Sequence, residues 1–96
     1  MPRLTDEEIA RAVVQTPWER EGDAIVREVE LEDFAAAIAF VDRVAELAEA
    51  VNHHPDILVH GWNRVRLTLS THSVGQITQA DLDLASAIDA TVGRVA

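Results

Sequence analysis

Cysteine is absent from this sequence of 96 residues, and basic residues are scarce, with 8 Lys and Arg against 17 Asp and Glu. Without cysteine the chain has no disulfide framework, no thiolate nucleophile and no cysteine-ligated zinc site. At a formal net charge of −9 it lacks the basic cluster that releases counterions from a phosphate backbone. We therefore expect no direct binding to DNA, RNA or anionic membranes.

Long hydrophobic runs are missing too. No apolar segment approaches the roughly 18 residues of a membrane-spanning helix, and no charged-then-apolar leader is visible, so we expect a cytoplasmic protein. The composition is 48% hydrophobic and rich in Ala, Val, Leu and Ile, which is typical of an ordered globular domain. We expect residues 1–96 to form a single domain with one core.

Local signals near the start of the chain predict a helix and a hairpin. Thr5 and Glu8 stand at the spacing of a capping box, which predicts a helix of about three turns that ends before Pro17. Residues 21–23, Glu-Gly-Asp, indicate a turn between two short strands. One face of the second strand carries Ile25, Arg27, Val29 and Leu31.

The hydrophobic period changes from two to about 3.6 at residues 32–33, which predicts the longest helix of the chain. This helix has a polar face with Asp42, Glu46 and Glu49, and Pro55 follows its end. Its broad apolar stripe comprises Phe34, Ala37, Ile38, Val41, Val44, Ala45 and Ala48.

A second hairpin and a last helix follow Pro55. Residues 57–60 and 65–72 are predicted strands separated by a turn, and His72 falls on the polar face of the second strand. Thr78 and Asp81 stand at capping-box spacing before a final amphipathic helix. We therefore predict an α+β fold in the order α-β-β-α-β-β-α, a four-stranded antiparallel sheet with three helices packed on one face.

Two adjacent histidines stand where the long helix ends. Pro55 disfavours the helical conformation for His54, so the rings of His53 and His54 can face one space beyond the helix end. Glu49 precedes His53 by one helical turn, and its carboxylate can therefore reach an imidazole. The same features also fit a solvated helix end with no function.

A spaced motif connects these residues with the rest of the chain. Its pattern is Glu49-x(3)-His53-His54-Pro55-x(6)-Trp62-x(9)-His72-x(8)-Asp81. This pattern resembles the signature of the pterin-4a-carbinolamine dehydratases, and the resemblance extends from Trp18 to Ile88. It implies a hydro-lyase without cofactor or metal that dehydrates 4a-hydroxytetrahydrobiopterin to quinonoid dihydropterin. The pterin substrate would come from an aromatic amino acid hydroxylase, as part of tetrahydrobiopterin recycling.

The resemblance also implies roles for individual residues. We expect catalytic roles for His53, His54, His72 and Glu49, and pterin-binding roles for Asn52, Pro55, Trp62 and Asp81. Histidine suits this reaction because it both donates and accepts protons near neutral pH. We expect His53 and His72 to exchange protons with the pterin, His54 mainly to bind it, and Glu49 to orient a histidine.

Several interpretations stay open. Asn52 departs from the Asp that the better-known family members often have before the histidine pair. Asp81 fits a helix cap as well as it fits a site residue. Trp62 equally fits a residue that covers the core or an interface. His60 lies outside the motif and receives no role. We expect no metal, because adjacent histidines rarely chelate one ion and the HExxH spacing is absent.

Two other functions compete with the enzyme. Some proteins that resemble this family are non-catalytic binding or assembly modules, acting in transcription-factor dimerisation or in the assembly of a carbon-fixing enzyme, and a pterin site could also serve molybdopterin metabolism. A short four-stranded sheet leaves an edge and an apolar surface that a symmetric partner would cover. We therefore expect a homodimer or homotetramer.

Overall fold

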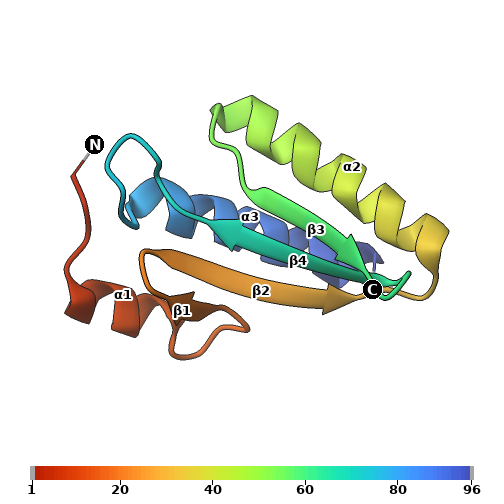
Figure 1. Ribbon diagram of the computed structural model, residues 1–96, viewed down its shortest axis with the longest axis horizontal. Helices are drawn as coiled ribbons and strands as arrows, with labels where there is room; N and C mark the ends of the chain where they lie inside the picture. Colours follow the sequence, from red (N-terminus) through yellow and green to blue (C-terminus); the bar gives the residue numbers. More distant parts are fainter. Residues whose placement is uncertain (1, 96) are drawn as a thin grey trace.

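The computed structural model describes residues 2–95, in which the chain forms three helices and four strands. In chain order these are α1 (Asp6–Val13), β1 (Glu19–Glu21), β2 (Ala24–Glu30), α2 (Phe34–Val51), β3 (Asp56–His60), β4 (Arg64–Leu69) and α3 (Gln79–Val95) (Figure 1). The predicted order of helices and hairpins is confirmed.

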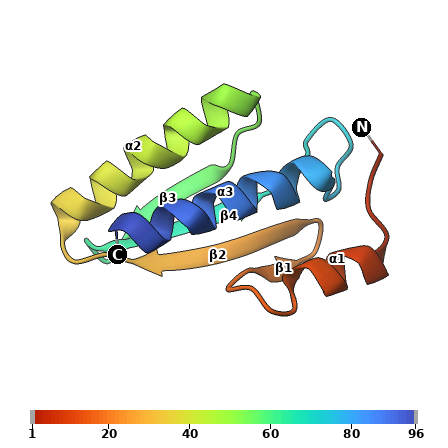
Figure 2. The ribbon, with the colours of Figure 1, turned by 180° about the vertical axis from the view of Figure 1, so that it is seen from behind.

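All four strands form one antiparallel sheet in the order β1-β2-β4-β3. The central strands β2 and β4 pair Ile25 with Leu69 and Val29 with Val65. The long helices α2 and α3 pack against each other over one face of the sheet, and α1 lies beside β1 (Figures 1 and 2). The predicted α+β architecture, with helices on one face of a four-stranded sheet, is therefore confirmed.

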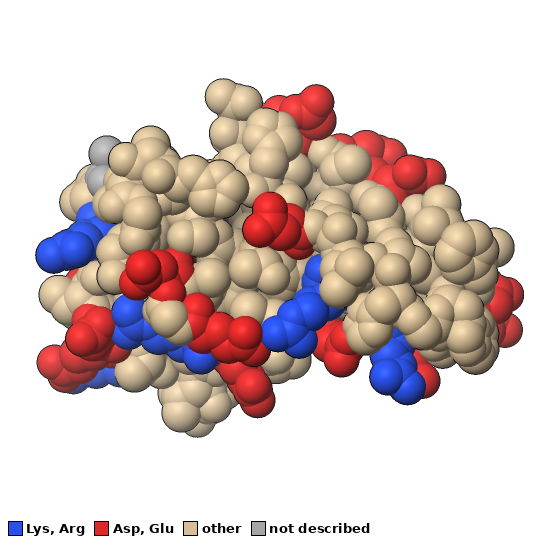
Figure 3. Space-filling model, viewed as in Figure 1, with Lys and Arg blue, Asp and Glu red and all other residues tan. Residues whose placement is uncertain are grey.

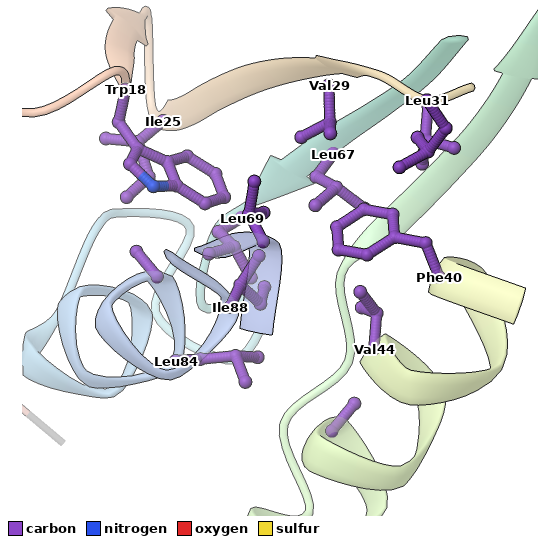
Figure 4. Packing of buried hydrophobic residues seen from close by; sticks show 14 of the residues in the cluster. Trp18, Ile25, Val29, Leu31, Phe40, Val44, Leu67, Leu69, Leu84 and Ile88 are labelled. Carbon is purple, nitrogen blue, oxygen red and sulfur yellow. The ribbon is translucent and has the colours of Figure 1, made fainter. Parts of the chain in front are cut away.

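The core lies between the sheet and the two long helices (Figure 4). Alternate residues of each central strand point toward the helices because successive side chains of a strand face opposite sides of the sheet. Side chains that are completely buried include Ile25, Phe40, Val44, Leu67, Leu69 and Ile88. These residues come from β2, α2, β4 and α3 and hold these four elements in fixed relation to one another.

The first helix is shorter than the sequence predicts. α1 covers 8 residues, just over two turns, although its capping box is present as expected. The chain leaves the helix in a tight turn in which the N–H of Thr16 donates to the carbonyl of Val13 over 2.9 Å. Proline disfavours the helical conformation for the residue before it, so Pro17 favours this early end.

The apolar stripe of α2 is only partly buried. Its buried residues are Ala37, Phe40, Val44 and Ala48, whereas Phe34 and Ile38 are 55% and 39% exposed. The stripe is wider than the surface that the sheet and α3 can cover, so its outer side stays open. Even so, no helix among residues 2–95 is both long and apolar enough to cross a membrane.

Candidate active site

The end of α2 aims the histidine pair out of the helix. Asn52 caps the helix in the left-handed conformation, with φ of 51° and ψ of 45°. Its N–H bonds back to the carbonyls of Ala48 and Glu49, and the N–H of His53 donates to the carbonyl of Ala48 over 3.1 Å. A left-handed residue of this kind ends a helix and redirects the chain. His53, His54 and Pro55 therefore lead directly into β3.

His72 reaches the same place from the other end of the β3–β4 hairpin. Because β3 and β4 are antiparallel, the end of β4 lies beside the start of β3, and Thr68 is the register partner of Asp56. A loop follows in which the N–H of Thr71 donates to the carbonyl of Gln76 over 3.0 Å. The three histidines consequently border one open depression of about 300 Å³, lined by Asn52, His53, His54, Pro55, Asp56, Ser70, Thr71, His72 and Ser73.

The carboxylate that contacts His53 is Asp81. Its side chain is 0% exposed, and Oδ1 lies 2.5 Å from Nε2 of His53. The other carboxylate oxygen accepts the hydroxyl proton of Thr71 over 2.8 Å and the N–H of Thr78 over 2.9 Å. Asp81 therefore caps α3, one of the two roles that the sequence left open, and also holds the ring of His53. Its pterin-binding role stays a prediction.

The partner expected for Glu49 is corrected by this geometry. Oε2 of Glu49 lies 2.8 Å from Nε2 of His54, whereas His53 pairs with Asp81. The left-handed Asn52 breaks the helical line on which Glu49 and His53 would share a face. Glu49 and His54 are 75% and 57% exposed, and such a surface pair contributes little to stability.

His72 and Trp62 differ sharply in where they lie. Within residues 2–95 the ring of His72 has no hydrogen-bond partner, so both its nitrogens are open to a ligand in the depression. Trp62 stands in the β3–β4 turn, at the far end of a 5-residue strand about 16 Å long, and is 63% exposed. It does not line the depression of its own chain, although the motif suggested a pterin-binding role.

Sequence reasoning missed part of the lining. Ser70, Thr71 and Ser73 border the depression, and Thr71 supports Asp81 directly. Their position in the sequence, on both sides of His72, could have indicated that they lie at the site. Among the described residues, no three His, Cys, Asp or Glu side chains gather as a metal site.

Comparison with known proteins places this architecture in a family. The family model described as pterin 4 alpha carbinolamine dehydratase matches residues 2–91. The chain belongs to this family. A relative from Chloroflexus aurantiacus is 53% identical over 94 residues, covering 97% of this chain and 100% of its own. Another, from Nocardia farcinica, is 56% identical over 87 residues, covering 90% of each chain. Both are named pterin-4-alpha-carbinolamine dehydratase only provisionally.

Solved structures share the fold. A transcriptional coactivator/pterin dehydratase from Brucella melitensis is 34% identical with a TM-score of 0.86, covering 93% of this chain and 97% of its own. A pterin dehydratase-like protein described as a RuBisCO assembly factor in the α-carboxysome is 26% identical with a TM-score of 0.69, covering 82% and 93%. Relatives with this fold are thus described both as a pterin dehydratase and as an assembly factor.

Proposed function

We propose that this protein is a 4a-hydroxytetrahydrobiopterin dehydratase, a hydro-lyase that forms quinonoid dihydropterin in tetrahydrobiopterin recycling. The reaction breaks the C4a–O bond, releases the hydroxyl group as water after it gains a proton, and removes the proton from N5. It therefore needs one proton donor and one proton acceptor at neighbouring positions. The observation that supports the proposal is that three imidazoles border one depression of about 300 Å³ and that a buried carboxylate contacts one of them, His53.

His53 is suited to be the proton acceptor. When its Nε2–H donates to Asp81, Nδ1 is the free acceptor of the neutral ring. The buried carboxylate fixes the ring and stabilises the positive charge that develops when the ring takes the N5 proton. Thr71 and the backbone of Thr78 in turn hold the carboxylate in place.

His72 and His54 complete the assignment. The exposed ring of His72 is free of protein partners in the described chain and donates the proton to the leaving hydroxyl. His54, held by Glu49 at the rim, binds the pterin rather than exchanging protons with it. Asn52 and Pro55 shape the same rim.

The test is a dehydration assay coupled to an aromatic amino acid hydroxylase. We expect His53→Ala and His72→Ala each to lower kcat by about 10²- to 10⁴-fold, the usual contribution of a general acid or base. Arg11→Ala is the control, because Arg11 is 79% exposed on α1, away from the histidines, and pairs with Glu7. Wild-type rates in both histidine variants would overturn the assignment. A chain that served only as an assembly module would show no saturable binding when titrated with a dihydropterin.

A further inference from the structure

The loop of residues 71–76 carries His72 and is built from backbone hydrogen bonds. The N–H of Thr71 donates to the carbonyl of Gln76 over 3.0 Å and closes the loop, and the N–H of Gly75 donates to the carbonyl of Thr71 over 2.8 Å. The ring of His72 is exposed and has no hydrogen-bond partner in the described part of the chain. Because no side chain holds the ring, the position of His72 depends on where this loop lies.

The turn between β1 and β2 lies beside this loop, at the same end of the sheet (Figures 1 and 2). Ile25, near the start of β2, is the register partner of Leu69 at the end of β4. Residues just before β2 therefore lie next to residues just after β4, and Asp23 is the last residue of the turn. Since β4 lies between β2 and β3, the loop has this turn on one side and the histidine pair on the other.

Asp23 is hydrogen-bonded to the chain on both sides of the loop. Nε2 of Gln76 donates to Oδ1 of Asp23 over 2.9 Å, and the hydroxyl of Ser70 donates to the carbonyl of Asp23 over 2.7 Å. Ser70 lines the depression between the histidines, whereas Asp23 and Gln76 lie outside its lining. The hydrogen bond between Asp23 and Gln76 therefore acts on a ligand in the depression through the loop.

The segment after the loop is held in place separately. The carbonyl of Ile77 accepts the N–H of Leu4 over 3.0 Å, and the side chain of Ile77 is completely buried. The N–H of Thr78 donates to Asp81 over 2.9 Å. Loss of the Gln76 side chain should consequently release the loop while Asp81 keeps its position.

We propose that Asp23 and Gln76 are positioning residues that hold His72 where it can donate its proton. This role rests on the proposed function, in which His72 protonates the leaving hydroxyl. Proton transfer needs donor and acceptor within hydrogen-bond distance, so a loop released from Asp23 presents the imidazole at the right place less often. The result is a lower kcat with little change in KM, because His54 and the rim bind the pterin.

Gln76→Met tests this role, because it keeps the length of the side chain, adds no charge and removes the N–H donor. We expect kcat to fall about tenfold, the factor by which losing one hydrogen bond to a charged group shifts the balance between a held and a released loop. In the His72→Ala variant the same substitution should lower kcat no further, because it acts through His72. A wild-type kcat in Gln76→Met, or an equal loss in both backgrounds, would overturn the role.

A matched control lies at the start of α3. Nε2 of Gln79 donates to Oδ1 of Asp83 over 2.9 Å, so this pair has the same chemistry and hydrogen-bond length as Gln76 with Asp23. It connects two residues of one helix and does not hold the loop. Gln79→Met should therefore keep the wild-type kcat, and a tenfold loss there would show that the effect is not specific to the loop.

Exchanging the two side-chain types gives a second test. Gln76→Glu places two carboxylates together and should lower kcat, although it keeps an oxygen that can accept the N–H of Ile77 as Gln76 does over 3.2 Å. Adding Asp23→Asn restores an amide–carboxylate hydrogen bond with donor and acceptor exchanged, and kcat should return close to the wild-type value. The double variant also keeps the net charge, which matters because acidic and basic side chains crowd the nearby surface over α1 and β1 (Figure 3). Failure of Asp23→Asn to restore kcat would overturn the proposal.

Amide hydrogen exchange separates this role from the proposed function. The N–H groups of Thr71 and Gly75 should exchange faster in Gln76→Met than in the wild type, and at the wild-type rate in Gln79→Met. Unchanged exchange of both amides in Gln76→Met would refute the hold on the loop, whether or not the protein turns over a pterin. Absence of turnover in the wild type would refute the proposed function, and with it the purpose of the hold but not the hold itself.

Discussion

Asp81 contacts both the start of a helix and a histidine of the proposed site with one side chain. It accepts the N–H of Thr78 at the start of α3 and contacts Nε2 of His53 from a completely buried position. The cap fixes the carboxylate, and the carboxylate fixes the imidazole. Stability and catalysis should therefore respond differently to substitutions at this residue.

We expect Asp81→Asn to retain the cap but lower kcat by about 10- to 100-fold, because an amide carries no charge to stabilise the imidazolium. Asp81→Ala should also lower the free energy of unfolding by about 1–3 kcal/mol, since it removes the buried hydrogen bonds that the carboxylate accepts. Steady-state kinetics and urea unfolding separate the two effects. A fully active Asp81→Asn enzyme would contradict the role given to this carboxylate.

Asn52 gives a prediction about backbone conformation. The left-handed backbone at this position, with φ of 51°, explains why Asn suits it. Asn and Asp reach this conformation more easily than other residues with a Cβ atom, and Gly reaches it freely. We expect Asn52→Ala to cost about 1 kcal/mol in unfolding free energy and Asn52→Gly to cost almost nothing. Equal stability of the two variants in urea would show that conformation is not what selects Asn52.

At the scale of elements, α1 depends on its capping box. The hydroxyl of Thr5 accepts the N–H of Glu8 over 3.1 Å, and the N–H of Thr5 donates to the carboxylate of Glu8 over 2.9 Å. The hydrogen bond from the backbone of Thr5, assisted by its side chain, lowers the pKa of Glu8 below the ordinary 4.5. Glu8 therefore stabilises the folded helix above that value, and the contribution is lost as the pH falls through the lowered pKa.

We expect α1 to lose protection from amide hydrogen exchange as the pH is lowered from 6 to below about 4, after correction for intrinsic exchange rates. Glu8→Gln should remove this pH dependence because it has no carboxylate to titrate. Glu7→Gln is a suitable control, since Glu7 lies on the same helix but its side chain pairs with Arg11 instead of the helix start. The same loss of protection in Glu8→Gln as in the wild type would contradict the assignment.

The elements also show what the sequence could predict. The spacing of residues in the sequence was sufficient to predict the helix cap at Thr5 and the turn at Gly22, because both depend on residues only a few positions apart. It could not indicate which flank of α2 is buried, since periodicity defines an apolar face but not the surface that covers it. The contact of His53 with Asp81 spans 28 residues and depends on how α2 and α3 pack. The sequence instead suggested Glu49 as the partner of His53, because Glu49 is only four residues away along the chain.

At the scale of the whole molecule, a second carboxylate, half-buried, connects elements away from the site. Oδ1 of Asp89, in α3, accepts the indole N–H of Trp18 over 2.8 Å and contacts the guanidinium of Arg27, in β2, at 2.5 Å. Arg27 shares the inner face of β2 with Ile25, as the alternation predicted, and its side chain is only 14% exposed. Asp89 lies eight residues beyond Asp81, about 12 Å along α3.

This separation predicts that stability and turnover respond independently. Asp89→Ala leaves the cation of Arg27 largely buried without its carboxylate, so we expect the free energy of unfolding to fall by about 2–4 kcal/mol. Asp89→Asn keeps a hydrogen-bond acceptor, so its free energy of unfolding should fall less than that of Asp89→Ala. Below the unfolding transition, kcat of both variants should match the wild type, because the histidines and Asp81 keep their contacts. Urea unfolding and the dehydration assay on the same preparations provide the check. A large fall in kcat of folded Asp89→Ala would mean that this end of α3 controls how Asp81 is held.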